Sequence, residues 1–241
     1  MARAGRDILG RDARRASLLA SPLFAAMTPA ELDAILTMAI EHRYHRGQTI
    51  FQKDDAGSAL MAVLAGRVRI SAVSAEGKEM TLNVISPGEV FGEIALLDGK
   101  PRSADATAIE ETILLVLERR DFLPFVLNNQ DLTARLLAIL CERLRRTSVA
   151  LEDIALFDLP VRLGRVLLKL GEDYGRPTDA GLRIDMKLSQ KDLSNLVAAT
   201  RESINKQLRT WREAGMVTID GGYLILTRPA RLKRLVEDDH A

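Results

Sequence analysis

The amino-acid sequence predicts an α+β fold in three successive parts: a β-rich first half, one long helix, and a second half of short helices closed by a hairpin. Three observations predict this order. Short apolar and β-branched runs between residues 41 and 117 alternate with glycine-containing turn signals, as in a sandwich, roll or barrel. Residues 131–157 contain no glycine or proline and follow a heptad pattern. Two helical patterns then precede a hairpin around "DGG" at residues 220–222.

Composition limits the classes of protein that the chain can belong to. Its 241 residues suit two domains, and 47% hydrophobic with 28% charged residues exclude global disorder. The net charge of +1 does not favour any class of partner. A nucleic-acid-binding surface would therefore have to come from local clustering of basic residues. The one cysteine, Cys141, excludes internal disulfides and a cysteine-ligated zinc or iron–sulfur site within one chain. It favours a reducing cytoplasm, and no apolar run is long enough to predict a membrane span.

The first two segments differ in character. Residues 1–20 mix arginines with small residues and predict a solvated basic arm without the apolar block of a signal peptide. Residues 21–130 are expected to form the β-rich domain. A helix opens it, because Thr28 is a suitable N-cap, Pro29 suits the first helical position and Glu31 completes a capping box.

The long helix, residues 131–157, carries one narrow apolar stripe. Its positions alternate in steps of three and four and are Leu137, Leu140, Leu144, Leu151 and Ile154. Thr147 fills the missing step of this seam. Such a stripe favours packing against a second copy of the helix and so predicts a homodimer, with packing on the helix's own domain as the alternative.

Residues 158–241 predict a helix-turn-helix followed by a hairpin. Ser189 and Thr200 are suitable N-caps of two helices separated by the small-residue turn "AAT". Ile204, Leu208 and Trp211 would form the inner face of the second helix. The residues left pointing outward are Arg201, Glu202, Asn205, Lys206 and Arg209. These side chains suit base and phosphate contacts in the major groove, although a solvated surface is the alternative.

The stretch "FGEIALLDGKPRSADA", residues 91–106, places glycines, a glutamate, an arginine and a serine between apolar runs. It could be a tight turn or a site for an anion. An arginine fork and a hydroxyl can hold a phosphate, and glycine permits close approach of the backbone.

From about Leu23 onward the chain resembles the cyclic-AMP receptor protein/FNR family of bacterial transcription regulators. The motifs that carry the resemblance are "FGEIALLDGKPRSA", "RRTS" and "TRESINKQL". The resemblance implies an N-terminal cyclic-nucleotide-binding β-roll, a long dimerisation helix and a C-terminal winged helix-turn-helix. It also implies a homodimer on double-stranded DNA with a TGTGA-like palindrome, and RNA polymerase as a partner.

The resemblance implies a set of ligand contacts: Gly92, Glu93, Arg102, Ser103, Arg143, Thr147 and Ser148. Arg102 and Ser103 would hold the cyclic phosphate. Glu93 would accept from the ribose hydroxyl and pair with Arg143. Thr147 would meet the purine of its own subunit and Ser148 the purine bound by the partner. Thr147 could instead only set the register of the seam.

The resemblance also implies the DNA contacts, which are Ser189, Gln190, Thr200, Arg201, Glu202, Asn205 and Lys206. Arg201 and Glu202 match the family's readers of guanine and cytosine. Lys206 stands where the best-known member has a second arginine, and lysine reaches the same acceptors as a point charge rather than a fork. Lys206 is therefore the residue that departs from the family pattern, and the contact that it affects is the one with the outer guanine.

Other branches of the family are disfavoured by what the sequence lacks. The oxygen-sensing branch needs a cluster of cysteines, whereas this chain has only Cys141. His42 and His45 flank Tyr44 at a strand end that predicts solvation rather than haem ligation. The phosphate motif is intact, whereas a cyclic-di-GMP branch usually loses part of it. We therefore expect cAMP or cGMP as an allosteric ligand, without a metal, haem or iron–sulfur cluster.

The sequence predicts that the protein is not an enzyme, because it offers no nucleophile–base set, metal-ligand cluster or nucleoside-triphosphate loop. Three alternatives stay open. They are a regulator specific for cGMP, a ligand-independent regulator, and a cyclic-nucleotide-binding module without a DNA role. A threonine hydroxyl both donates and accepts, so Thr147 does not separate the two purines.

Overall fold

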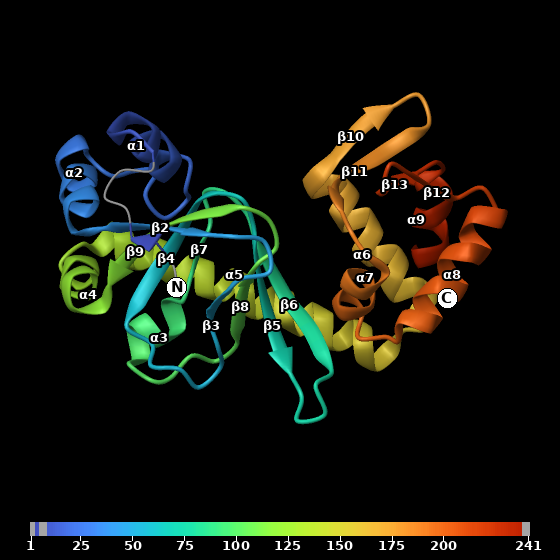
Figure 1. Cartoon of the computed structure of the whole chain (residues 1–241), viewed down its shortest axis with the longest axis horizontal. Helices are drawn as coiled ribbons and strands as arrows, with labels where there is room; N and C mark the ends of the chain where they lie inside the picture. The colour runs from blue at the N-terminus through green and yellow to red at the C-terminus, as the bar shows by residue number, and fades with distance from the viewer. Residues whose placement is uncertain (1–2, 5–8, 238–241) are drawn as a thin grey trace. The chain divides into compact units, whose positions relative to one another are not determined.

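The computed structural model describes residues 3–4 and 9–237 (Figure 1). The chain divides into two compact units, one of residues 1–78 with 82–145 and one of residues 79–81 with 146–241. The first unit contains the β-rich part and the second contains the helix pair and the hairpin. The boundary between the units falls inside the long helix, after Arg145, rather than at one of its ends.

Two antiparallel sheets build the β-rich part. The five-stranded sheet has the order β1 (Arg3–Ala4), β2 (Ile40–Tyr44), β9 (Thr112–Glu118), β4 (Ala59–Ala65) and β7 (Val90–Phe91). The four-stranded sheet has the order β3 (Thr49–Phe51), β8 (Asp105–Ala108), β5 (Val68–Val73) and β6 (Glu79–Ile85). The predicted β-roll is confirmed, and non-consecutive strands lie next to one another in both sheets.

The interior strand β4 is buried on both faces, which explains its uninterrupted apolar sequence "ALMAVLA". Leu60, Ala62 and Leu64 belong to one core cluster with the surrounding helices. Met61 and Val63 belong to the other cluster, inside the roll. Successive side chains of a strand point to opposite faces, so a sheet covered on both sides requires an apolar residue at every position.

The described helices that accompany these sheets are α1 (Arg11–Leu19), α2 (Pro29–Met38), α3 (Glu93–Asp98), α4 (Arg119–Leu127) and α5 (Gln130–Leu156). Helices α1, α2 and α4 gather beside the five-stranded sheet (Figure 1). The predicted start of α2 is confirmed, since Thr28 and Glu31 form a capping box and Pro29 occupies the first turn.

The expected solvated arm of residues 1–20 is instead folded over much of its length. Leu18 of α1 is buried in the core cluster beside the helices. Arg14 Nε lies 3.1 Å from an oxygen of Glu41, whose side chain is fully buried. Two further arginines of α1 pair with Asp33 of α2. The acidic partners that hold this segment lie in other elements, so its local composition did not reveal them. The remaining parts of the expected arm, residues 1–2 and 5–8, lie outside the described residues.

The second unit begins in α5 and contains α6 (Leu159–Tyr174), α7 (Gln190–Leu196), α8 (Arg201–Glu213) and α9 (Pro229–Glu237). Its sheet has the order β10 (Gly175–Thr178), β11 (Gly181–Lys187), β13 (Tyr223–Leu226) and β12 (Val217–Asp220). Ile204, Leu208 and Trp211 are buried, as the sequence predicted for the inner face of the second helix. Helix α9 was not predicted. None of the described helices is long and apolar enough to cross a membrane.

Candidate functional sites

Gly92 ends β7 and caps α3, and the surrounding atoms require a glycine there. Its φ of 83° lies in the left-handed region. A Cβ at this position would lie 2.6 Å from Arg102 Nη1 and 2.9 Å from the carbonyl oxygen of Ala59. The missing side chain therefore lets the Arg102 guanidinium lie against the backbone at the start of α3.

Arg102 is the buried cation of this site, with 4% of its surface exposed. Its Nη1 donates to the Gly92 carbonyl at 3.1 Å and its Nη2 to the Ala59 carbonyl at 2.9 Å. Burial lowers the pKa of Arg102, and the nearby carboxylates, Glu93 first, act against that shift. Among the described residues, its buried Nε has no hydrogen-bond partner. A buried guanidinium with an unused donor fits an anionic ligand.

The turn that carries Arg102 and Ser103 is held by the loop before β4. The Arg102 N–H donates to the Asp55 carbonyl at 2.8 Å, and the Arg102 carbonyl accepts from the Asp54 N–H at 2.9 Å. Ser103 is exposed beside the buried arginine. These two hydrogen bonds hold the backbone of the predicted phosphate motif against the loop before β4.

Glu93 and Arg143 form an ion pair, as the resemblance implied. Glu93 is 1% exposed at the first turn of α3, whereas Arg143 comes from α5 and also donates to the Val90 carbonyl. Arg143 therefore joins the long helix to the end of β7 and the start of α3. The structure brings Gly92, Glu93, Arg102 and Arg143 together from segments far apart in the sequence.

Thr147 and Ser148 lie about one turn beyond Arg143 on α5, are exposed, and belong to the second unit. Their contacts with a purine stay predictions. The apolar stripe of the same helix is largely uncovered, with Leu137, Leu144 and Leu151 all more than half exposed. Leu132 and Leu136, near the start of the helix, are instead buried in the first unit's core.

The helix-turn-helix has the N-caps that the sequence predicted. The Ser189 hydroxyl accepts from the Asp192 N–H, and the Asp192 carboxylate accepts from the Ser189 N–H, which is a capping box. The Thr200 hydroxyl accepts from the Ser203 N–H at 3.1 Å. Between the helices, Ala198 adopts a left-handed φ of 50°. The capping box fixes where α7 begins, and the Thr200 cap fixes where α8 begins.

One face of α8 is polar and exposed over its first half. The exposed residues of this face are Arg201, Glu202, Asn205 and Lys206. Arg201 Nε lies 3.4 Å from the side-chain oxygen of Gln190, the first residue of α7, so two predicted DNA contacts from different helices are neighbours. Thr200 and Ser189 are also exposed. The predicted DNA contacts therefore cluster at the N-terminal ends of α7 and α8.

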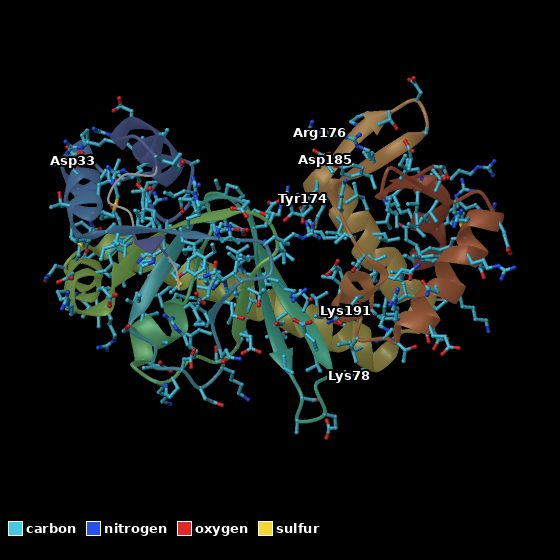
Figure 2. All side chains as sticks on the ribbon, in the orientation of Figure 1. Asp33, Lys78, Tyr174, Arg176, Asp185 and Lys191 are labelled. Carbon is cyan, nitrogen blue, oxygen red and sulfur yellow. The ribbon has the colours of Figure 1, made fainter. Side chains whose placement is uncertain are left out.

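Sequence reasoning missed two features of these regions. Phe51 of β3 lies with its ring centroid 4.3 Å from Arg102 Cζ, although only an isolated aromatic in "QTIF" pointed to it. On the sheet of the second unit, Arg176 and Asp185 lie side by side with Nε and Oδ2 2.8 Å apart (Figure 2). The pairing of β10 with β11, rather than any sequence motif, brings these two side chains together.

Metal ligation has no candidate in the part of the chain that the structure describes, where no group of three or more His, Cys, Asp or Glu side chains could hold an ion. The sites consist instead of arginines, hydroxyls, one buried carboxylate and an exposed polar helix face. Such groups bind ligands and nucleic acid through charge and hydrogen bonds.

Comparison with known proteins gives the class first. The model of the cyclic nucleotide-binding domain matches residues 41–129, and that of the Crp-like helix-turn-helix domain matches residues 161–235. The chain thus joins a cyclic-nucleotide-binding domain to a DNA-binding helix-turn-helix. Its relatives include the cyclic AMP receptor protein of Thermus thermophilus, 33% identical over 89% of this chain and 96% of that protein. The chain belongs to the Crp–Fnr family of transcription regulators.

Other relatives agree with this assignment. A CRP-like cAMP-activated global transcriptional regulator of Mycobacterium tuberculosis is 29% identical over 88% of this chain and 95% of that protein. A solved structure of a CRP-family regulator from Thermus thermophilus is 26% identical, covers 81% of this chain and 96% of its own, and has a TM-score of 0.70. The c-di-GMP-responsive regulator CLP of Xanthomonas campestris, 20% identical, covers 83% of this chain and 100% of its own with a TM-score of 0.75, which shows a shared fold.

Proposed function

We propose that this protein is a homodimeric regulator that binds cAMP in the β-roll and then binds a palindromic, TGTGA-like operator. The observation that carries the proposal is the buried Arg102 guanidinium with its unused Nε, beside the Glu93–Arg143 pair. The protein acts as a regulator rather than an enzyme, works in the cytoplasm and engages RNA polymerase.

In the ligand site, charge assigns the roles. A cyclic phosphodiester carries one negative charge, which Arg102 and the hydroxyl of the adjacent, exposed Ser103 bind. Glu93 would repel that phosphate, so it accepts from the ribose hydroxyl, and Arg143 holds it in place. Gly92 permits close approach of the backbone. The names of the Mycobacterium and Thermus relatives favour cAMP, and cGMP offers the same phosphate and ribose.

The dimer forms through the exposed stripe of α5. Leu137, Leu144 and Leu151 recur at heptad spacing and are each more than half exposed. Thr147 occupies the same stripe and Ser148 follows it. At a seam between two copies, these hydroxyls would meet the purine of their own subunit and that of the partner, respectively. Ligand and partner then share one surface of the helix.

The proposed DNA-binding surface consists of the N-terminal half of α8 and the N-terminal end of α7. Arg201 binds guanine through its fork and Glu202 accepts from a cytosine amine. Lys206, one turn further on, reaches the outer guanine or a phosphate as a point charge. The N-termini at Ser189 and Thr200, with Gln190 and Asn205, contact the backbone or neighbouring bases. A dimer reads two half-sites about one helical turn apart.

Cyclic nucleotide controls DNA affinity by binding one conformation of the dimer more tightly than another. A ligand shifts such an equilibrium only by its differential affinity for the two conformations. The ion pair of Arg143 with Glu93 offers a physical link, because it connects the ribose-binding carboxylate to the dimerisation helix.

The decisive experiment is calorimetry with cAMP and cGMP in parallel, followed by gel-shifts on a TGTGA palindrome with and without each nucleotide. We expect cAMP to bind and to raise operator affinity. Arg102→Ala should abolish measurable nucleotide binding, whereas Arg120→Ala, an exposed arginine on α4, should leave it unchanged. Absence of binding to both nucleotides would overturn the proposal.

A second candidate is a ligand-independent regulator. The observation in its favour is that both Nη groups of Arg102 already donate to carbonyls of the chain itself. This candidate predicts equal operator affinity with and without nucleotide, and an Arg102→Ala variant that binds the operator as the parent does. The same gel-shift series therefore separates the two.

A further inference from the structure

Phe51 is the last residue of β3 and is only partly buried, with its ring against the guanidinium of Arg102. Arg102 Cζ lies 4.3 Å from the ring centroid, within the range of a cation–π contact. The ring is itself supported by Phe91, whose centroid is 5.9 Å away and which is fully buried. The buried cation thus lies over an aromatic ring that is itself supported by a buried neighbour.

The backbone of Arg102 is fixed without Phe51. Its N–H and carbonyl form hydrogen bonds of 2.8 and 2.9 Å with Asp55 and Asp54, respectively. What these bonds leave free is the long side chain, which has several rotatable bonds between the backbone and the guanidinium. The orientation of the guanidinium plane must therefore come from contacts of the side chain itself.

Three contacts set that orientation. Nη1 and Nη2 donate to the carbonyls of Gly92 and Ala59, and Cζ lies over the ring of Phe51. A guanidinium is planar, so the two hydrogen bonds orient the plane and the ring restricts its movement on one side. Nε is one donor that these contacts leave without a partner in the described part of the chain.

Charge gives the same contact a second effect. Burial disfavours the cation and lowers the pKa of Arg102, whereas the electron-rich face of an aromatic ring attracts it. Leucine or methionine at position 51 would fill the same space without that attraction. An aromatic residue at position 51 should therefore affect Arg102 in a way that an aliphatic residue of similar size does not.

We propose that Phe51 is a positioning residue of the ligand site, which acts through Arg102 by holding its guanidinium plane ready for the anionic phosphate. The inference rests on the proposed function of nucleotide binding. Because Phe51 acts on the phosphate-binding cation and not on the base, its effect is the same for cAMP and cGMP.

The test is calorimetry of the full-length chain with cAMP and with cGMP. Phe51→Leu should weaken binding of whichever nucleotides the parent binds by about three- to tenfold, by the same factor for both. Phe51→Tyr, which keeps the aromatic face, should restore parental affinity. Phe24→Leu is the matched control, because Phe24 is buried against Phe122 in the other core cluster. That control should lower the melting temperature and leave nucleotide affinity unchanged.

A double-mutant cycle tests whether Phe51 acts on nucleotide binding through Arg102 or independently of it. In an Arg102→Lys background, whose ammonium retains weak phosphate binding without a planar fork, Phe51→Leu should have a clearly smaller effect than in the parent. If Phe51→Leu does not fold, Phe51→Met gives the same comparison.

The outcomes separate the two hypotheses. Parental affinity in Phe51→Leu, or an equal loss in the tyrosine variant, overturns the positioning role while the parent still binds nucleotide. A parent that binds neither nucleotide overturns the proposed function and this role with it.

Discussion

At the scale of single residues, Gly92 combines two constraints, a left-handed φ and the close approach of other atoms. Its φ of 83° disfavours any side chain, and a Cβ would also meet Arg102 and the Ala59 carbonyl. Gly47 has nearly the same φ, 82°, but nothing lies within 4 Å of its Cβ position. The pair therefore separates backbone strain from steric clash.

We expect Gly47→Ala to cost about 1 kcal/mol of unfolding free energy, from the left-handed conformation alone. Gly92→Ala should cost at least about 2 kcal/mol, because the clash adds to the strain. It should also weaken nucleotide binding, since Arg102 Nη1 must move. Urea unfolding and calorimetry measure both effects. Equal stability losses in the two variants would contradict the role of the clash.

Ala198 presents the opposite case, an alanine where glycine would be better suited. It lies in the turn between α7 and α8 with a φ of 50°. Ala198→Gly should raise the unfolding free energy of the second unit by about 0.5–1 kcal/mol, because relief of the strained Cβ outweighs the added freedom of the unfolded chain. Ala199→Gly, one residue on and without positive φ, should lower it. Urea titration followed by Trp211 fluorescence reports on this unit, and a loss of stability in Ala198→Gly would refute the strain.

At the scale of elements, one cluster holds the junction between α5 and α6. Arg165 of α6 forms an ion pair with Asp153 of α5, and both side chains are mostly buried. Its Cζ also lies 3.9 Å from the ring centroid of Phe157, in the link between the helices. One arginine thus contacts both sides of the junction.

Asp153→Asn should destabilise the second unit by about 1–2 kcal/mol, because it removes the Asp153 charge that pairs with a largely buried arginine. The neighbouring change Glu152→Gln, at an exposed position of the same helix, should have an effect below about 0.5 kcal/mol. Chemical denaturation of both variants measures the difference. Indistinguishable stabilities would show that the pair does not hold the junction.

Elements also differ in how well their sequence predicted them. The capping boxes at Thr28 and Ser189 were predicted from residues three apart, and both are present. Helix α1 was predicted as a solvated arm because its arginines find their partners, Glu41 and Asp33, in other elements. Hydrogen bonds within one helical turn can be predicted from the sequence, whereas long-range ion pairs depend on which elements the fold brings together.

At the scale of the whole molecule, the proposed homodimer rests on the exposed stripe of α5. Leu144 is 68% exposed on this stripe, and Leu127, on α4, is 67% exposed outside it. Leu144→Glu should convert the dimer to a monomer and abolish operator binding, because the charge would be buried at the seam. Leu127→Glu should leave both unchanged. Light scattering after size-exclusion chromatography measures the mass, and a Leu144→Glu variant that stays dimeric would place the interface elsewhere.

The sequence by itself determined the order of the three parts and the type of their main elements, although α1 and α9 were not predicted. Apolar runs between turn signals, the heptad stripe and the two helix caps are periodic or local signals, and each lies within one continuous segment of the chain. The polar face of α8 followed from the same periodicity, and Arg201, Glu202, Asn205 and Lys206 are exposed as expected. The resemblance to the family predicted in addition that Glu93 pairs with Arg143, and the structure contains this ion pair.

Only the tertiary structure decided what surrounds Arg102. The pairing of β3 with β8 and the loop before β4 bring Phe51, Asp54 and Asp55 to it. The contact of Phe51 with Arg102 joins residues about fifty positions apart, and no period or motif in the sequence links them. The physical reason is that a buried cation takes its partners from every element that reaches it, and the path of the whole chain determines which elements do.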